Sequence, residues 1–92
     1  MELVFKAIAD LSRRRVLDEL LIKDGQTVSE LAATLPRMTR FGAMKHLRVL
    51  ENAGLVVTRR EGRTKRHFLN PMPIQRINDR WFSKFSPPAP PR

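Results

Sequence analysis

The chain has 92 residues, enough for one small domain, and its lack of cysteine excludes disulfide bonds and thiolate metal sites. No apolar run approaches the ~20 residues that a membrane-spanning helix needs, so we expect a soluble, cytoplasmic protein with no membrane partner. Lys and Arg number 18 against nine Asp and Glu, which gives a formal net charge of +9.

The positive charge is concentrated in the middle of the chain. Residues 37–66 carry nine basic side chains and only two acidic ones, Glu51 and Glu61, a net charge of +7. A merely solubilising surface would mix both signs, whereas a polyanion-binding surface gathers one sign. A membrane surface is the weaker alternative, because this segment lacks the broad apolar face of interfacial helices. The charge distribution therefore favours a nucleic acid as partner.

Apolar residues recur at helical spacing in the first two predicted elements. Asp10 and Ser12 are both suitable N-caps for the second helix, because their side chains accept hydrogen bonds from backbone N–H groups. Gly25 follows Asp24 where this helix is expected to stop. The residues expected to face the core are Leu3, Val4, Ile8 and Leu11 in the first helix and Val16, Leu17, Leu20 and Leu21 in the second.

A shorter third helix is predicted after Thr27. Thr27 and Glu30 have the capping-box spacing, in which each side chain bonds the backbone N–H of the other residue. Pro36 ends this helix, because its ring cannot continue the hydrogen-bond ladder. The apolar side of the helix is expected to consist of Leu31, Ala32 and Leu35.

A longer fourth helix is predicted over residues 39–52, with Thr39 as its N-cap. At about 100° per residue, Ala43, Leu47 and Leu50 fall on one side and are expected to face the core. The opposite side is rich in hydrogen-bond donors and consists of Arg40, Phe41, Met44, Lys45 and Arg48.

A basic hairpin and a last helix complete the predicted order. Residues 55–60 and 63–69 are rich in β-branched and basic side chains and are separated by a Glu-Gly turn, which predicts two antiparallel strands. Two prolines in residues 70–73 then suit the first turn of a helix. The proline-rich residues 86–92 are expected to form an extended, mobile tail.

This order of elements predicts a mainly α fold with a small β-hairpin, a winged helix-turn-helix of five helices and a two-stranded wing. Residues 1–85 would form one DNA-binding and dimerisation domain. The second helix of a helix-turn-helix enters the major groove of double-stranded DNA. The like charges of the wing repel one another unless a polyanion lies nearby. The expected DNA contacts are Thr39, Arg40, Phe41, Gly42, Met44, Lys45 and Arg48 in the recognition helix, and Arg59, Arg60, Arg63, Lys65 and Arg66 in the wing.

Residues 39–57, TRFGAMKHLRVLENAGLVV, resemble the recognition helix and the start of the wing in the ArsR-type transcriptional repressors. A capping Ser or Thr, a His-Leu pair and an Ala-Gly-Leu-Val run recur in that family. The similarity extends over roughly residues 3–85. The resemblance implies a repressor that is a homodimer, pairs through its terminal helices and binds an inverted-repeat operator.

The chain departs from the metal-sensing members of that family. Many of them bind metals through cysteines in the third helix or through Asp and His clusters in the last. Here the third helix has no cysteine, Asp79 is the one candidate ligand of the last helix, and His46 and His67 are single. We expect no metal site and no cofactor, and no pattern in the sequence identifies a small-molecule effector.

Three residues of the fourth helix, Phe41, Gly42 and Met44, stand where small hydroxylated residues are commoner in the family, so the operator sequence does not carry over. Phe41 and Met44 either fold down onto the neighbouring helix or contact thymine methyl groups in the major groove. Gly42 either permits a close approach to the DNA backbone or is simply tolerated in the first turn.

The last helix carries more aromatic surface than a terminal helix facing water would. Its apolar residues are spaced i, i+3, i+7 and i+11, so a regular helix places them on one face. They either complete the core of the monomer or form a dimer interface, and we expect the dimer. The expected interface residues are Phe5 from the first helix and Ile74, Ile77, Trp81, Phe82 and Phe85 from the last.

Other classes of function are less consistent with the sequence. No nucleophile with a matching base, glycine-rich phosphate loop or spaced pair of carboxylates is present, so we do not expect an enzyme. The alternative is a sequence-independent nucleic-acid-binding protein, architectural or RNA-directed, which would need stacking aromatics among its basic residues. Only Phe41 and Phe68 lie there. A protein-docking module would not need the concentrated charge.

Overall fold

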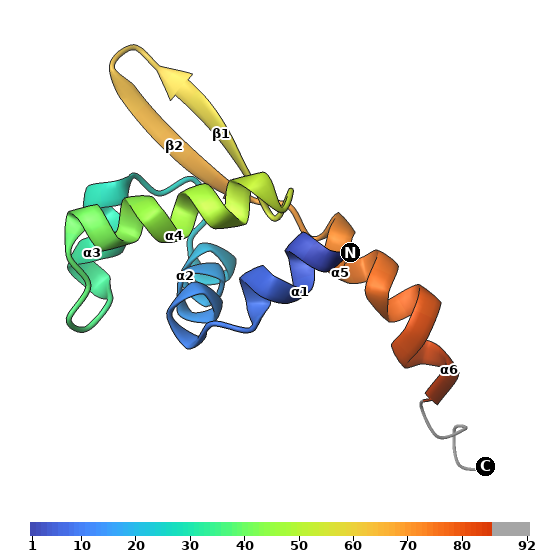
Figure 1. Cartoon of the computed structure of the whole chain (residues 1–92). Helices are drawn as coiled ribbons and strands as arrows, with labels where there is room; N and C mark the ends of the chain where they lie inside the picture. Colours follow the sequence, from blue (N-terminus) through green and yellow to red (C-terminus); the bar gives the residue numbers. More distant parts are fainter. Residues whose placement is uncertain (86–92) are drawn as a thin grey trace, which may run out of the picture.

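The computed structural model describes residues 1–85, and the expected mobile tail, residues 86–92, lies outside the described residues. The fold is the predicted one, with helices followed by an antiparallel hairpin and a final helical segment (Figure 1). The elements are α1 (Glu2–Ile8), α2 (Leu11–Ile22), α3 (Val28–Thr34), α4 (Arg40–Asn52), β1 (Val56–Glu61), β2 (Thr64–Leu69), α5 (Met72–Ile77), η1 (Asn78–Phe82) and α6 (Ser83–Phe85). No helix within residues 1–85 is long and apolar enough to cross a membrane.

The core lies where α2, α3 and α4 meet, with α1 and the start of the hairpin closing it. In Figure 1 the hairpin and α2 lie on opposite sides of α4, so α4 is the central element of the domain. The largest fully buried side chains include Leu20, Leu31 and Leu50, one from each of the three helices. The complete cluster is Val4, Ala7, Val16, Leu17, Leu20, Leu31, Leu35, Leu47, Leu50, Leu55, Val56 and Ile77.

Three leucines expected in this core, Leu3, Leu11 and Leu21, are exposed instead. Asp10 caps α2 by accepting a hydrogen bond from the Arg13 N–H at 3.1 Å, so the first helix ends before Leu11 and cannot include it in its buried face. In the short helix α1 the buried residues are Val4 and Ala7, one turn apart, so Leu3 faces solvent. In α2 the last buried residue is Leu20, and Leu21 after it is exposed. These exposed leucines are the first departure from the sequence-based prediction.

Both helices of the helix-turn-helix begin at the predicted N-caps. The Glu30 N–H donates to Thr27 Oγ1 at 3.2 Å, and the Thr27 N–H donates to Glu30 Oε1 at 3.4 Å, which completes the capping box of α3. Thr39 Oγ1 accepts from the Gly42 N–H at 2.9 Å and starts α4. Between the helices, Arg37 has a φ of 59°, a left-handed conformation that allows the sharp turn. Because both caps are local, the sequence alone indicates where α4 begins.

The wing is the hairpin of β1 and β2, in antiparallel register from Val56 opposite Leu69 to Glu61 opposite Thr64. Its turn is Gly62-Arg63, one residue later than expected, because Glu61 still pairs with Thr64 and Gly62 supplies the positive φ of 62°. At its base, β2 also forms an isolated bridge between His67 and Gln26, in the loop before α3. The wing is therefore attached to the helix-turn-helix through both strands, β1 by the chain that continues from α4 and β2 by this bridge.

The C-terminal arm, formed by α5, η1 and α6, projects away from the rest of the domain (Figure 1). It replaces the regular final helix of the prediction, because η1 is π-helical and the Ser83 N–H donates to the Asn78 carbonyl five residues earlier. Such a wide turn changes the direction in which later side chains point. The arm therefore does not keep one apolar stripe along its length.

Candidate nucleic-acid interface

The outward face of α4 carries the side chains that the sequence predicts there. Ala43, Leu47 and Leu50 are buried against the core. The opposite side is exposed to solvent, and Phe41 has 69% of its surface accessible. Phe41 thus does not fold down onto the neighbouring helix, and its ring is open to solvent. The other exposed members of this face are Arg40, Met44, Lys45 and Arg48.

Gly42 supports the cap of α4. A Cβ atom at this position would lie 3.1 Å from Thr39 Oγ1 and 3.5 Å from Met38 Sδ. The first distance is shorter than an ordinary contact, so a side chain here would push against the oxygen that caps the helix. Gly42 therefore keeps space for the Thr39 cap, a role within the protein that is separate from the close approach to DNA expected from the sequence.

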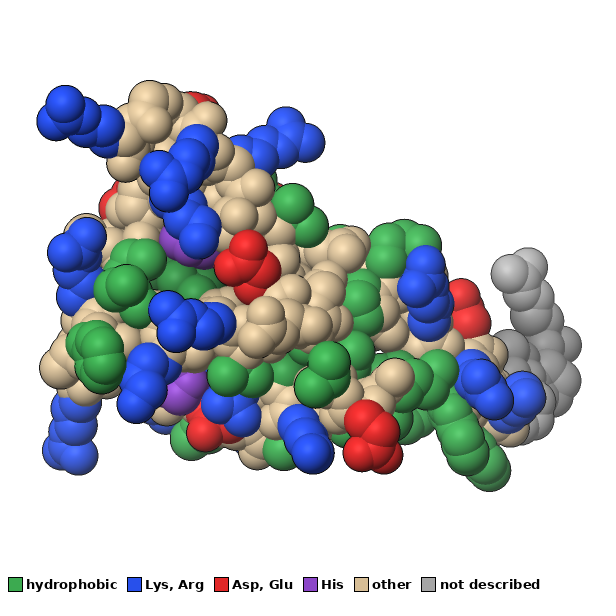
Figure 2. Space-filling view, turned by 45° about the horizontal axis from the view of Figure 1, so that its top comes forward, with side chains coloured by type: hydrophobic (Ala, Val, Ile, Leu, Met, Phe, Trp, Pro, Cys, Tyr) green, Lys and Arg blue, Asp and Glu red, His purple; other side chains and the backbone are tan. Residues whose placement is uncertain are grey.

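A polar groove joins the start of α4 to the tip of the wing. Its volume is about 300 Å³. Arg40 lines one side, and Arg63 and Lys65 line the other, so the groove has cations on both walls. Lys and Arg side chains gather over the wing and the helices beneath it (Figure 2). The remaining lining residues are Thr27, Val28, Ser29 and Thr64.

The hydroxyl residues of this groove are not among the DNA contacts predicted from the sequence. Thr27 and Ser29 lie at the start of α3, and Thr64 begins β2. Hydroxyl groups are common phosphate ligands, but their nearness to the wing depends on how the hairpin folds back over α3. Arg37 is also not among those predicted contacts, although it is an exposed cation in the turn directly before α4. Because Arg37 begins the basic segment 37–66, the sequence could have indicated it as a candidate DNA contact.

The register of the wing sets like charges opposite each other, with Arg59 facing Arg66 and Arg60 facing Lys65. Such pairs repel unless something compensates the charge. Lys65 Nζ lies 4.0 Å from Glu51 Oε2, and the Arg59 guanidinium lies over the Phe68 ring, 5.8 Å from its centroid. Among residues 1–85, Arg60 and Arg63 form no ion pair with a carboxylate, so they are the wing cations most available to an external anion.

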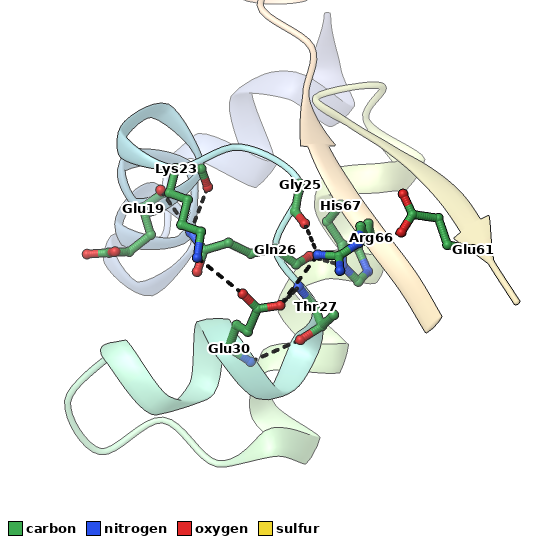
Figure 3. A network of polar contacts seen from close by, with 9 residues as sticks. All are labelled: Glu19, Lys23, Gly25, Gln26, Thr27, Glu30, Glu61, Arg66 and His67. Carbon is green, nitrogen blue, oxygen red and sulfur yellow. Dashed lines mark hydrogen bonds and ion pairs between the residues drawn. The ribbon is translucent and has the colours of Figure 1, made fainter. Parts of the chain in front are cut away.

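Arg66 stands apart from the other wing cations. Its side chain points toward the loop before α3 and contacts Glu61, Glu30 and the Gly25 carbonyl (Figure 3). The tip residues Arg63 and Lys65, in contrast, line the groove. The five expected wing cations therefore do not share one environment, since Arg63 and Lys65 line the groove and Arg66 faces the loop before α3.

His67 is buried at the base of the wing, with 2% of its surface exposed. Its Nδ1 lies 2.9 Å from the Gln26 carbonyl oxygen, and since a carbonyl only accepts, Nδ1 carries the proton. Burial holds the pKa of His67 below its usual range, and nearby Lys65 lowers it further, against the opposing effects of Gln26 and Glu51. The ring is therefore neutral at pH 7 and acts as a hydrogen-bond donor in the wing.

The apolar residues expected at a dimer interface do not all share one surface. Ile77 has 2% of its surface exposed and belongs to the core of its own chain, so it is not available as expected. Ile74 lines a separate hollow with Leu11 and Leu21, because η1 turns the later residues of the arm away from it. A second hollow, of about 490 Å³, is lined by Met1, Phe5, Ile77, Trp81, Phe82 and Phe85.

No group of three His, Cys, Asp or Glu side chains that could hold a metal ion occurs within residues 1–85. His67 is held by Gln26 at the base of the wing, and His46 lies on α4. The two histidines thus belong to different parts of the domain, as the sequence indicates.

Comparison with known proteins identifies the family. Residues 8–59 match the family described as "Helix-turn-helix domain". The chain belongs to this family. An uncharacterized HTH-type transcriptional regulator of Bacillus subtilis (strain 168), YuzN, is 37% identical over 83 residues, which are 85% of this chain and 90% of that protein. The chain is thus a transcriptional regulator with a helix-turn-helix DNA-binding domain.

Solved structures of transcriptional regulators share the arrangement of the elements. An ArsR-like transcriptional regulator from Rhodococcus sp. RHA1 is 32% identical, with a TM-score of 0.77, and the match covers 91% of this chain and 80% of that one. The homodimeric winged helix-turn-helix DNA-binding domain of Mb0332 from Mycobacterium bovis is 27% identical, with a TM-score of 0.70, covering 91% of this chain and 76% of that one. The likeness to the ArsR family expected from the sequence is confirmed.

Proposed function

We propose that this regulator is a homodimeric repressor that reads an inverted-repeat operator with α4 and holds the DNA backbone with its wing. The observation that carries the proposal is the groove between Arg40, at the start of α4, and Arg63 and Lys65, at the wing. A recognition helix contacts base edges with its N-terminal residues, and phosphate contacts from a neighbouring element fix its register. The groove supports the proposal because a candidate base contact and candidate phosphate contacts line the same hollow.

The outward face of α4 supports reading of bases. Arg40 and Lys45 are donors that suit the acceptor edge of guanine, and the exposed ring of Phe41 suits a thymine methyl group. In the first turn of the helix, Thr39 and Gly42 are used to cap it and leave these side chains directed outward. Arg60 and Arg63 lack carboxylate partners among the described residues and suit phosphates.

A homodimer is supported by the apolar hollow between α1 and the arm. Phe5, Trp81 and Phe85 have 43%, 49% and 76% of their surfaces exposed. The Mb0332 domain, a relative of the same fold, is homodimeric. A twofold pairing would place two recognition helices about 34 Å apart, one turn of duplex DNA, which requires half-sites in inverted orientation.

A competition binding assay tests this function. Labelled DNA from upstream of the regulator's own gene is challenged with random duplex and with single-stranded DNA. We expect the upstream duplex to compete at least about 1,000-fold better than random duplex, as specific repressors do. Equal competition by random duplex would contradict sequence-specific binding, and better competition by the single strand would favour the stacking alternative. Repression is then tested by in vitro transcription from that promoter, where added protein is expected to lower the transcript level.

A further inference from the structure

Arg66 lies in the wing but has a different environment from the cations at the wing tip. We propose that Arg66 is a positioning residue, which fixes the wing against the start of α3 and does not bind phosphate. This inference rests on the proposed role of the wing in DNA binding. We call Arg66, Glu61, Glu30 and the Gly25 carbonyl the wing anchor (Figure 3).

Carboxylates compensate the charge of Arg66 within the protein. Its Nε donates to Glu61 Oε2 at 3.0 Å, and its Nη1 lies 3.6 Å from Glu30 Oε1. A guanidinium that already faces two carboxylates gains little from a phosphate, because those carboxylates would repel the incoming anion. Arg63 at the tip has no such partner among residues 1–85 and serves as the matched comparison.

The guanidinium also binds the backbone that joins the wing to the helical domain. Arg66 Nη1 donates to the Gly25 carbonyl at 3.0 Å. The Gly25 N–H in turn donates to the His67 carbonyl, and the His67 N–H donates to the Gln26 carbonyl, both at 2.9 Å. Arg66 therefore reinforces the isolated bridge between β2 and the loop before α3.

The residue on the other side of the anchor is itself fixed. The Thr27 N–H bonds Glu30 through the capping box, and Lys23 Nζ lies 3.6 Å from Glu30 Oε2 (Figure 3). The hydrogen bonds from Thr27 lower the pKa of Glu30, with Lys23 and Arg66 acting in the same direction, so the carboxylate is charged at neutral pH. Arg66 thus connects the wing to a side chain that already has partners in the helical domain, Thr27 and Lys23.

The wing needs such a connection because it is a two-stranded ribbon, which is only marginally stable alone. Its tip residue Arg63 must stay beside Arg40 for the groove to keep its shape. A wing free to swing would have to be ordered on binding, which weakens affinity without removing a phosphate contact. Positioning and phosphate binding are therefore distinguishable by experiment.

The test compares Arg66→Gln with Arg63→Gln, which removes the same charge from the wing tip. Amide hydrogen exchange of the DNA-free protein is measured at Gly25 and His67. We expect about three- to tenfold faster exchange at both amides in R66Q, the range expected for a partly exposed charged hydrogen bond, and no change in R63Q. Unchanged exchange in R66Q would overturn the proposal. Because this measurement uses no DNA, a failure of the proposed function does not affect it.

The second measurement is the salt dependence of duplex binding. A variant that no longer touches one phosphate has a slope of log K against log salt that is shallower by about 0.9 per protomer, or about 1.8 for a dimer. We expect R63Q to lower the slope by this amount, and R66Q to weaken binding about three- to tenfold at every salt concentration with the slope unchanged. A slope lowered equally in R66Q would make Arg66 a phosphate contact and overturn the proposal. Wild-type protein that does not bind duplex would instead contradict the proposed function.

Glu30→Gln provides an independent check should R66Q fold poorly. Glutamine serves in a capping box as well as glutamate does, so α3 keeps its cap while Arg66 loses one carboxylate. We expect E30Q to speed exchange at Gly25 and His67 as R66Q does, and the double variant to add little more. Exchange at wild-type rates in E30Q would overturn the anchoring role.

Discussion

The ammonium group of Lys45 lies over the ring of Phe41, 5.2 Å from its centroid, on the outward face of α4. The contact joins a cation to an aromatic face one helical turn away and restrains both side chains. It presents an apolar ring and a donor together on the surface proposed to enter the major groove. Phe41 and Lys45 are therefore expected to act as a pair in reading a base step that contains thymine.

Replacing Phe41 by alanine is expected to lower the preference for operator over random duplex by about 0.8 kcal/mol for each thymine methyl group that the ring covers. The check is binding of wild type and variant to an operator selected in vitro, with each thymine of the half-site replaced in turn by uracil. Uracil lacks the methyl group, so it should weaken wild-type binding at the contacted position and leave the variant unaffected there. Equal losses for both proteins would contradict the contact.

Alanine at Arg40 is expected to reduce the preference for the operator by about 1–3 kcal/mol, because a base-contacting side chain distinguishes sequences. Alanine at Arg63 and Lys65 together should weaken binding to operator and random duplex alike, because phosphates carry no sequence information. Titrations of both duplexes with each variant separate the two effects. If every substitution produced the same loss on both duplexes, α4 would not read bases.

The salt dependence of binding reports how many phosphates the dimer neutralises. With about three to five contacts from each protomer, the slope of log K against log salt is expected to lie near −5 to −9. Arg66 is not counted among these contacts. Fluorescence titrations at four salt concentrations measure the slope. A value shallower than about −3 would contradict a wing and helix that bind mainly phosphates.

Removing Trp81 and Phe85 together is expected to dissociate the dimer and abolish tight operator binding. Each large aromatic side chain contributes roughly 1.5–3 kcal/mol when it is buried, so their loss removes much of the interface energy. Analytical ultracentrifugation at micromolar concentration distinguishes monomer from dimer. Ile22→Ala is the control, because Ile22 is 80% exposed on α2 and does not line the aromatic hollow. A monomeric wild type, or a double variant that dimerises unchanged, would refute the arrangement.

Stability is expected to fall as the pH drops from about 7 through 6.5, the ordinary pKa of histidine, because the pKa of His67 is lowered in the folded protein. The unfolded chain then binds a proton that the folded chain does not, so acid favours unfolding. Urea denaturation at several pH values measures the effect, and a His67→Gln variant should lack this part of the pH dependence. An identical pH profile in the variant would assign the effect to other groups.

The elements predicted correctly from the sequence are those fixed by neighbouring residues. The capping box of Thr27 and the N-cap at Thr39 depend on side chains three residues away, and the two faces of α4 follow from helical spacing alone. Spacing also places Ile77 on an apolar face, but it does not show whether a second chain or the protein's own core covers that face. Arg66 is grouped with the wing tip for a similar reason, since its partner Glu30 belongs to another element.

The hydrogen bond between His67 and Gln26 joins residues that are 41 positions apart, and the whole helix-turn-helix lies between them. Closing such a loop costs entropy before any contact compensates for it, whereas the hairpin and the helices form from neighbouring residues within microseconds. We therefore expect the connection between the wing and the loop before α3 to form after the hairpin and the helices that it joins. The groove between the wing and α4 would then be completed last, once each of its walls is already folded.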